Sequence, residues 1–486
     1  MENSVANLPL AFLFSILYCD WIYDYKHVEV DEVSSNEKIE RPYVALKDKI
    51  YLSVRNKSDK FLFAHLNEGE IEFLEKVHLD GKDIYPKKLP YDNGHYREIV
   101  GIPDLQAVFV METKEAGDLL EEIKQHIEEY IVAPESDLEI FSYYILFTWF
   151  YQKVNTLPYI RFLGDSGKGK SRFLQVISDI CFYPISISAA SSGSAMMRLN
   201  ETWRGTVVID ESDIDGGTEN MLIKYLNLGF ERGKYITKCK ASDYNSFDYF
   251  DPYCPKIISM RKPFRDNATE GRLISFTPKE EVVEGAKVNL PPQYAMDVKI
   301  LRGMIARFVL FNWNKVDASM VQNCDWPDIE NRIKQIVLPL SVLCNLLPEK
   351  MNLLENFVYK RQNEMKKVRS QSWEGTVFNH VFVLARNEDK IPEGFDEFVG
   401  SDGIIRIPPM MVAKSMGSSS RSITENLKGI GMISESSRIE LSDGQKATKR
   451  YYAVPDESTW KGILKRYWVG NEDIECPEAL KSKSYN

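Results

Sequence analysis

At residues 164–171 the chain reads Gly-Asp-Ser-Gly-Lys-Gly-Lys-Ser, and this stretch decides the fold. It matches the phosphate-loop pattern G-x-x-x-x-G-K-[ST]. Residues 159–163, Tyr-Ile-Arg-Phe-Leu, have the composition of a strand, and the amphipathic segment that begins at Lys170 is typical of a helix. A glycine-rich loop between a strand and a helix is the setting in which this pattern binds phosphates, so the sequence predicts a parallel α/β core with a nucleotide site.

The chemistry of a phosphate loop explains its residue types. Glycines permit backbone angles at which successive N–H groups converge on phosphate oxygens, and the start of the helix adds its dipole. The lysine reaches the β- and γ-phosphates and the following hydroxyl ligates Mg²⁺, which are the roles expected of Lys170 and Ser171. The predicted nucleotide-binding residues of the loop are Gly164, Asp165, Ser166, Gly167, Lys168, Gly169, Lys170 and Ser171.

Residues 206–211, Thr-Val-Val-Ile-Asp-Glu, form an apolar strand pattern that ends in two carboxylates. Downstream of a phosphate loop, this pair predicts that Asp210 holds Mg²⁺ through its water shell and that Glu211 polarises the attacking water. Lys170, Asp210 and Glu211 are therefore predicted to be catalytic, with Ser171 and Asp210 holding Mg²⁺. No guanine-reading N/TKxD motif follows, so ATP is the expected nucleotide and hydrolysis the expected reaction.

With these residues in place, the chain from about Leu119 to Leu340 resembles superfamily-3-like AAA+ helicases and the helicase-type modules attached to primases in phages, plasmids and integrated elements. The resemblance rests on the short interval between the two motifs, on the lead-in strand from Leu157, and on residues 227–233 and 255–264. Typical superfamily-3 enzymes end their sensor strand in asparagine, and this chain departs from that pattern.

The resemblance implies further roles around the nucleotide. A polar sensor stands at the end of the strand over 256–261, and Ser259 and Arg261 both qualify. Arg272 is favoured as the arginine that reaches the γ-phosphate of a neighbouring subunit, although a surface salt bridge explains it equally well. Arg332 is a weaker candidate for a second sensor in a helical lid.

Related ring helicases project a hairpin into the central channel from the position of residues 232–244. Alternation along this segment predicts a strand with one basic face, and its lysines Lys234, Lys238 and Lys240 are the candidates for contacts with the phosphate backbone. A solvated charged strand is the equally weighted alternative.

Residues 408–454 have the pattern of a winged helix: a helix over 408–416, a serine-capped helix over 418–428, and two strands over 433–441 and 447–454. Residues 401–455 hold eight Lys and Arg against five Asp and Glu. The candidates for DNA contacts are Arg421, Lys428, Lys446, Lys449 and Arg450, although winged helices also bind proteins.

Four regions follow from the texture of the sequence. They are a β-rich accessory domain over 1–115, with turns expected at residues 67–69, 80–81 and 92–94, an AAA+ core with helical lid over 116–365, a winged helix over 366–457, and a tail over 458–486. The fold class expected is thus α/β, with a phosphate-loop AAA+ core between a β-rich domain and a winged helix.

The seven cysteines are scattered without a CxxC pair, which favours reduced thiols in a cytoplasmic protein. Apolar residues 8–19 and 140–151 are interpreted as buried helices, so no membrane association is expected. The net charge of −10 excludes a uniformly basic surface, but it does not exclude a local basic patch.

Three classes of function compete. The favoured function is that of a replicative helicase of a mobile element or virus, which moves on single-stranded DNA as a homo-hexamer. The second is that of a DNA-binding initiator or helicase loader that does not unwind DNA. An ATP-dependent protein remodeller or transcriptional activator is third, because the GAFTGA loop of such activators is absent and the hairpin is basic. Double-stranded DNA and a separate primase or initiator protein are further expected partners, since no primase metal motif stands around Asp20 and Asp24.

Overall fold

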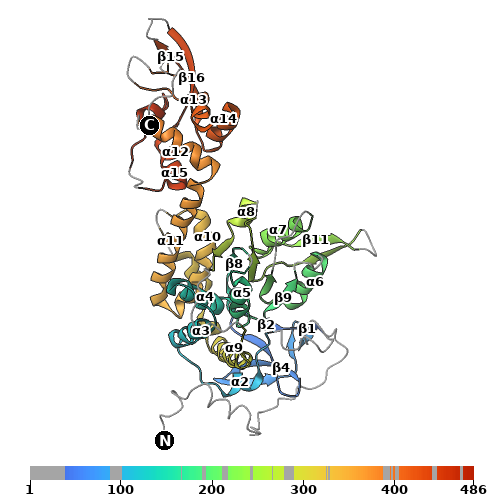
Figure 1. The fold of residues 1–486 in the computed structure, drawn as a ribbon. Helices are drawn as coiled ribbons and strands as arrows, with labels where there is room; N and C mark the ends of the chain where they lie inside the picture. Colours follow the sequence, from blue (N-terminus) through green and yellow to red (C-terminus); the bar gives the residue numbers. More distant parts are fainter. Residues whose placement is uncertain are drawn as a thin grey trace. The chain divides into compact units, whose positions relative to one another are not determined.

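The protein is described by a computed structural model (Figure 1). The description covers residues 39–87, 101–165, 167–188, 193–210, 217–240, 245–264, 266–278, 289–323, 326, 329–386, 395, 398–399, 404–440, 446–470 and 474–485. The chain divides into two compact units, Met1–Glu355 and Asn356–Asn486. The expected turn at residues 92–94 and the apolar residues 8–19 lie outside the described residues.

The first unit begins with short strands, and their pairs are antiparallel, as the alternation of the sequence predicts, except for the parallel pair of β1 with β7. One sheet has the order β2-β3-β4-β5 and another has the order β1-β7-β6. The strands are β1 (Ile39–Arg41), β2 (Tyr43–Ala45), β3 (Ile50–Arg55), β4 (Phe61–Asn67), β5 (Glu70–Leu74), β6 (Val77–Leu79) and β7 (Lys82–Pro86). The two expected hairpin turns are present, because Glu68 and Gly69, and likewise Asp80 and Gly81, adopt the positive φ of tight two-residue hairpins.

The centre of the first unit is a five-stranded sheet in the order β14-β8-β13-β10-β9, in which every neighbouring pair is parallel. Its strands are β8 (Tyr159–Leu163), β9 (Ile185–Ser188), β10 (Val207–Asp210), β13 (Lys256–Met260) and β14 (Leu273–Phe276). β13 is buried along its whole length, as expected of a central strand covered on both faces. The predicted parallel α/β core is therefore present.

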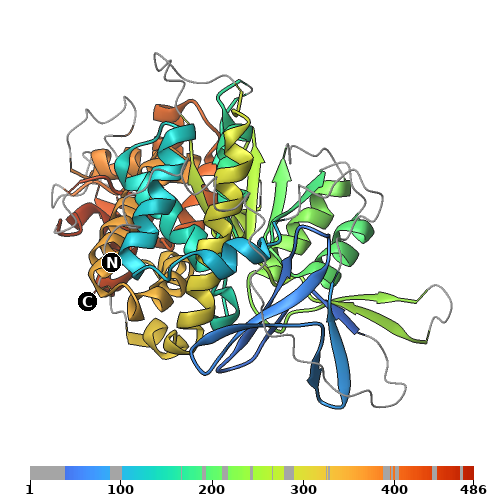
Figure 2. The same cartoon turned by 90° about the horizontal axis from the view of Figure 1, so that it is seen from below.

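Helices surround this sheet and fill the rest of the first unit. They are α2 (Leu105–Val110), α3 (Ala116–Tyr130), α4 (Glu135–Thr148), α5 (Lys170–Ser178), α6 (Gly193–Trp203), α7 (Gly217–Gly229), α8 (Asn267–Glu270), α9 (Gln293–Asn312) and α10 (Asn331–Val337). Short 3-10 turns accompany them at Tyr151–Lys153, Trp313–Lys315, Ala318–Asn323, Leu338–Asn345 and Pro348–Lys350. α3 lies beside both α4 and α9, in cyan and yellow in Figure 2.

The apolar stretch predicted to be a buried helix is α4, whose residues from Ile140 onward are all buried. A helix that is apolar all round lies in the interior of a protein. Among the described residues, no helix combines the length and the apolar character that crossing a bilayer requires.

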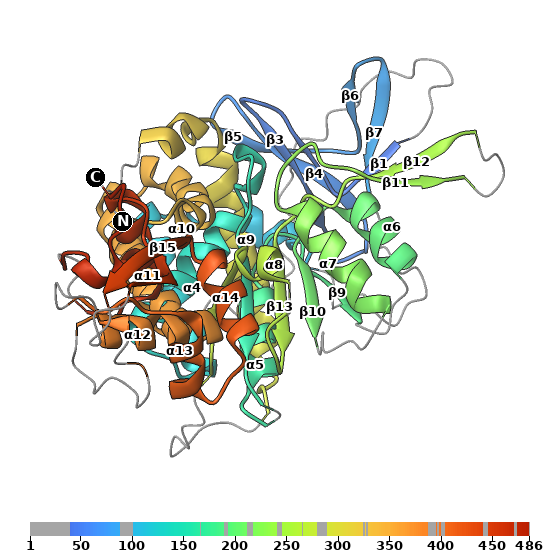
Figure 3. The same ribbon diagram turned by 90° about the horizontal axis from the view of Figure 1, so that it is seen from above.

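A separate hairpin, β11 (Ile236–Cys239) and β12 (Phe247–Phe250), extends outward beside α6 and α7 (Figure 3). Among the strands that the structure describes, these two pair only with each other. β11 lies within residues 232–244, for which the sequence predicts a projecting hairpin, whereas β12 follows that segment.

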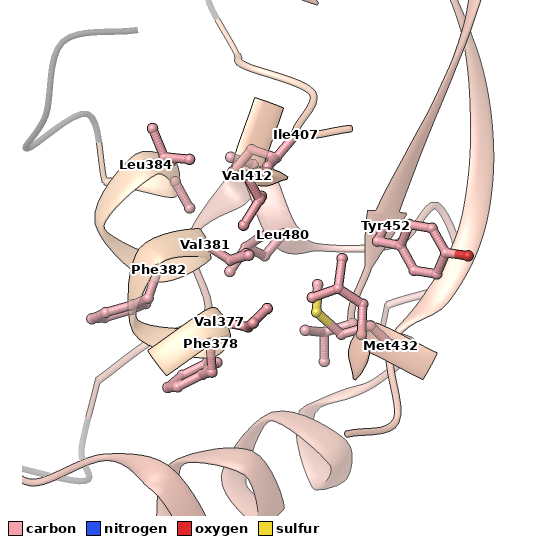
Figure 4. Packing of buried hydrophobic residues seen from close by; sticks show 14 of the residues in the cluster. Val377, Phe378, Val381, Phe382, Leu384, Ile407, Val412, Met432, Tyr452 and Leu480 are labelled. Carbon is pink, nitrogen blue, oxygen red and sulfur yellow. The ribbon is translucent and has the colours of Figure 1, made fainter. Parts of the chain in front are cut away.

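The second unit has its own core, shown in Figure 4. Its elements are α12 (Trp373–Ala385), α13 (Pro409–Met416), α14 (Ser420–Gly429), β15 (Ile433–Glu440), β16 (Lys446–Ala453), α15 (Glu457–Tyr467) and a 3-10 turn at Glu478–Leu480. α11 (Met351–Ser370) leads into it. Helix α14 begins where the serine cap was expected, since the Ser419 side chain accepts a hydrogen bond from the N–H of Ser422.

Residues 458–486 were expected to form a charged tail, but the described part of this segment is folded. α15 contributes Trp460, Ile463 and Leu464 to the core of the second unit, and Leu480 is fully buried in the same core. The Trp460 indole also donates to the carbonyl of Ile474 at 2.7 Å. These residues therefore complete the second unit, and the spacing of their apolar side chains at i, i+3 and i+4 was the available signal.

Candidate functional site

The glycine-rich loop joins the end of β8 to the start of α5, at the carboxyl edge of the central sheet. Gly164, Gly167 and Gly169 have φ values of 154°, 87° and 73°, which a side chain would strain. The N–H of Gly164 donates to the carbonyl of Met260 at 3.2 Å, which ties the loop to β13. Ser166 lies outside the described residues. These three glycines thus have the positive φ values expected in a phosphate-binding loop.

The start of α5 is open to an anion. Its first turn follows Gly169, which offers no side-chain acceptor as a cap. The early N–H groups of a helix have no intrahelical partner, and together with the dipole they attract negative charge. Lys170 folds back over the loop and donates from Nζ to the carbonyl of Asp165 at 2.6 Å.

One hydrogen bond joins the loop to the acidic strand. The Ser171 hydroxyl on α5 donates to Oδ2 of Asp210, the last residue of β10, at 3.1 Å. A hydroxyl and a carboxylate at this separation are the hard oxygen ligands that Mg²⁺ takes, so the two residues fit the predicted metal. Glu211 follows directly in the chain but lies outside the described residues.

The candidate sensor strand β13 lies between β8 and β10 in the sheet. Ser259 is buried and pairs with Phe162, one residue before the end of β8. Arg261 stands just past the end of β13 and is exposed. Both residues are therefore at the same edge of the sheet as the glycine loop, where the sequence placed a sensor.

Arg272 lies at the opposite edge of the sheet. It directly precedes β14, whose Leu273 pairs with Tyr159, the first residue of β8. The glycine loop begins only after the fifth residue of β8, Leu163. At about 3.3 Å per residue, some 13 Å of strand separates the two ends, so Arg272 stands away from its own loop.

Arg332 lies beside Arg272. Both guanidinium groups donate to the carbonyl of Ala268, at 2.8 Å from Arg332. They also lie over the ring of Phe230, at 5.3 Å for Arg272 and 5.6 Å for Arg332. The structure thus groups Arg332, the weaker candidate for a second sensor, with Arg272 at the amino edge of the sheet.

Burial lowers the pKa of both arginines, and the charge of Arg272 lowers that of Arg332 further. Both remain charged, because guanidinium groups hold their proton in proteins. Two like charges therefore lie side by side here, and the carboxylates of Asp266 and Glu231 act on the charge of Arg272.

An ion pair between a buried arginine and a partly buried glutamate, which the sequence did not reveal, holds this arginine segment. Arg161 in β8 makes a two-pronged contact with Glu270, with Nη2 to Oε2 at 2.8 Å, and Glu270 also accepts from the N–H of Phe264 at 2.6 Å. Nearby, hydrogen bonds from Thr269 and Asn227 hold the pKa of Asp266 at about 2. These carboxylates fix the backbone that carries Arg272.

The hairpin lysines do not share one exposed face. Lys238 is half-buried and donates to the Ser194 hydroxyl at 2.8 Å, whereas Lys234 and Lys240 are exposed. The more exposed face of the hairpin instead carries Phe247 and Tyr249. The strand alternation was predicted correctly, but packing against α6 occupies Lys238.

In the second unit, alternation separates the basic residues of the β15–β16 hairpin. Lys446 and Arg450 are exposed on one face of β16, and Arg438 of β15 is exposed opposite Thr448 on that face. Lys449 points the other way and lies over the ring of Phe398 at 4.7 Å. Arg438 was missed by the sequence reasoning, although its parity in the strand would have found it.

The predicted recognition helix α14 presents two of its basic residues to solvent. Arg421 is exposed and pairs with Glu425 through Nε and Oε1 at 3.1 Å. Lys428 is seven residues further along and also exposed, so both lie on one side of the helix.

No protein-family model and no curated protein matches the sequence. Among solved structures, the apo NrS-1 C-terminal region is similar with a TM-score of 0.40 and 12% identity, over 82% of this chain and 95% of that chain. An A-form structure of the same region gives a TM-score of 0.39 at 11% identity, over 82% and 96%. A JCV helicase gives 0.25 at 12% identity, over 48% and 61%. At these TM-scores the likeness carries no argument, so the function proposed below rests on the residues of this chain.

Proposed function

We propose that this chain is a Mg²⁺-dependent ATPase whose hydrolysis drives movement along single-stranded DNA, as a ring helicase. The observation that carries the proposal is the hydrogen bond between Ser171 and Asp210, which brings the glycine loop and the acidic strand together at one edge of the sheet. A loop alone binds phosphate, but a loop joined to a carboxylate also offers the ligands for the metal that hydrolysis uses.

Each residue of this site takes the role that the sequence pattern assigns to it. Lys170 leaves the Asp165 carbonyl and binds the β- and γ-phosphates, while the N–H groups at the start of α5 hold the remaining phosphate oxygens. Ser171 and Asp210 would hold Mg²⁺, which neutralises the charge that develops on the phosphates. Glu211 accepts the proton of the attacking water. Ser259 and Arg261 stand beside the γ-phosphate.

The distance between Arg272 and its own loop supports a ring. An arginine at the amino edge of the sheet stabilises charge on a γ-phosphate only if that phosphate belongs to a neighbouring subunit. A head-to-tail interface, in which the loop edge of one subunit meets the arginine edge of the next, closes into a ring when its rotation permits. The homo-hexamer implied by the family resemblance is the ring we propose.

A second function is favoured by the exposed basic face of Arg438, Lys446 and Arg450 in the second unit. Together with Arg421 and Lys428 on α14, this face would let a winged helix bind double-stranded DNA as the main contact. The chain would then be an initiator or helicase loader that hydrolyses ATP without unwinding.

Substitution of Lys170 tests the ATPase. Lys170→Ala removes the cation that binds the β- and γ-phosphates, so ATP hydrolysis by the purified protein falls by about 10²- to 10³-fold. Lys57→Ala, which removes an exposed lysine in the turn before β4, is the matched control and keeps full activity. Equal hydrolysis by the two variants would refute the assignment of the site.

A further inference from the structure

We propose that Tyr294 and Arg302 on α9 are positioning residues for the nucleotide site, because they hold the carboxyl end of the phosphate-loop helix α5. Both residues contact the end of α5 that lies opposite the glycine loop, so they act on the site through the direction of the helix. The inference rests on the proposed function and adds to it the contacts that keep the phosphate-binding end of α5 in place.

The glycine loop alone gives α5 little support. Gly167 and Gly169 lead into the helix with positive φ values of 87° and 73° and carry no side chain that could pack. Among the described residues, no atom lies within 4 Å of the position that a Cβ would take at either glycine. The phosphate-binding N–H groups at the start of α5 therefore take their direction from contacts further along the helix.

Two hydrogen bonds from α9 hold the carboxyl end of α5. The helix has nine residues, so Asp179, which follows the last of them, lies about 13 Å from Lys170. The Tyr294 hydroxyl donates to Oδ2 of Asp179 at 2.9 Å, and Nε of Arg302 donates to the backbone carbonyl of the same residue. One contact holds the side chain and the other holds the backbone, so this end of the helix is restrained in more than one direction.

Arg302 also supplies the cation that is favourable at the carboxyl end of a helix. The last turn of α5 contains no basic residue of its own. Arg302 is only 8% exposed, so water screens little of the interaction between its charge and the end of α5. Burial raises the pKa of Asp179, and both the charge of Arg302 and the hydrogen bond from Tyr294 oppose that rise. The two α9 residues thus favour the charged form of the carboxylate that Tyr294 binds.

The part of α9 that carries these residues is itself held by its neighbours. Asp297, one turn after Tyr294, accepts a hydrogen bond from the Tyr130 hydroxyl of α3 at 2.8 Å. The backbone at Gly101 lies close over the Arg302 guanidinium, because a Cβ there would be 3.2 Å from Cζ. The end of α5 is therefore attached to a support that does not move freely.

Two matched tyrosines separate the positioning of α5 from general stability. Tyr294→Phe removes the hydroxyl that binds Asp179, whereas Tyr130→Phe removes a hydroxyl that binds Asp297 and leaves the contacts of α5 intact. We would measure binding of a fluorescent ATP analogue with Mg²⁺ to the full-length protein, and unfolding of each variant in denaturant. We expect both variants to unfold at lower denaturant concentration, because each loses one buried hydrogen bond. Only Tyr294→Phe weakens nucleotide binding, by about 3- to 10-fold.

Arg302 provides a second pair of variants. Arg302→Lys keeps a cation at the carboxyl end of α5, and Arg302→Met removes it but keeps an unbranched side chain. We expect the affinity for the ATP analogue to fall in the order wild type, Arg302→Lys, Arg302→Met. The reverse order of the two Arg302 variants would contradict the role of the charge. Equal binding by the wild type and Tyr294→Phe, or an equal loss in Tyr294→Phe and Tyr130→Phe, would overturn the positioning role.

These outcomes are distinct from failure of the proposed function. If the wild type shows Lys170-dependent hydrolysis and Tyr294→Phe binds nucleotide as tightly as the wild type, only the positioning role is refuted. If the wild type shows no Lys170-dependent hydrolysis, the proposed function is refuted, whatever α9 contributes to the position of α5.

Discussion

Ser171 and Asp210 are 39 positions apart in the chain, yet their side chains meet at 3.1 Å. Local sequence predicted both residues, because a phosphate loop and an acidic strand end are each recognisable by pattern. The contact between Arg161 and Glu270 has no such pattern, since it joins a strand to a distant short helix. Motif residues of the site were thus predictable, whereas the residues that hold the arginine segment were not.

At the same scale, the structure gives one pH-dependent prediction. His126 on α3 is buried against the rings of Tyr130 and Tyr294, and burial lowers its pKa to about 4. Below pH 6.5 the His126 imidazole is protonated in the unfolded chain but stays neutral in the folded protein until the pH approaches 4. The contribution of His126 to stability is therefore complete above pH 6.5 and is lost as the pH falls toward 4, by about 3 kcal/mol in total.

Urea unfolding at pH 7 and pH 5 measures this loss. The wild type loses about 2 kcal/mol of unfolding free energy through His126 between these values. His126→Phe keeps an aromatic ring but cannot titrate, so its unfolding free energy changes by correspondingly less. The same pH dependence in both proteins would show that His126 is not the responsible group.

At the scale of elements, periodicity and turn residues predicted α3, β8, α14 and the β15–β16 hairpin, because each is a local pattern. The order of the central sheet was not available in this way. β13 lies between β8 and β10 because crossover connections bring it there. No local sequence pattern indicates this order of strands. The faces of the β11–β12 hairpin were likewise fixed by packing against α6, which took Lys238 inward.

Removal of Glu270 tests how the elements around Arg272 are held. Arg161 is only 3% exposed, so Glu270→Ala leaves a buried charge whose remaining side-chain contacts are with the Ser275 hydroxyl and the Met260 sulfur, neither of which is charged. We expect a loss of about 3–5 kcal/mol of unfolding free energy, measured in denaturant. Glu75→Ala is the control, because its pair with Lys60 is about half exposed and costs at most about 1 kcal/mol.

If Glu270→Ala were no more costly than Glu75→Ala, the pair would not hold the segment. Glu270→Gln keeps hydrogen-bond acceptors without the charge and should lie between the two. The order of the three variants therefore separates the effect of charge from that of shape.

At the scale of the whole molecule, the separation of Arg272 from its own loop predicts complementation between subunits. Lys170→Ala and Arg272→Ala proteins are each inactive alone. When the two variants are mixed in equal amounts, a head-to-tail interface takes its loop from one subunit and its Arg272 from the next. Roughly a quarter of the interfaces then have both an intact loop and an intact Arg272. ATP hydrolysis therefore recovers to about that fraction of the wild type.

A residue that acts within its own chain cannot recover in this way. If the mixtures are as inactive as the separate variants, Arg272 does not act on a neighbouring subunit and has a structural role at the amino edge of the sheet. A mixture of Lys170→Ala with Lys57→Ala controls for dilution, because only the Lys57→Ala subunits then carry an intact loop.

The most direct test of the account is ATP hydrolysis by the purified wild-type protein with and without single-stranded DNA, with Lys170→Ala measured in parallel. We predict Mg²⁺-dependent hydrolysis that single strands stimulate strongly and that Lys170→Ala abolishes under both conditions. Hydrolysis indifferent to single strands would contradict a translocating helicase and favour the loader or initiator. Hydrolysis that persists in Lys170→Ala would contradict the nucleotide site itself.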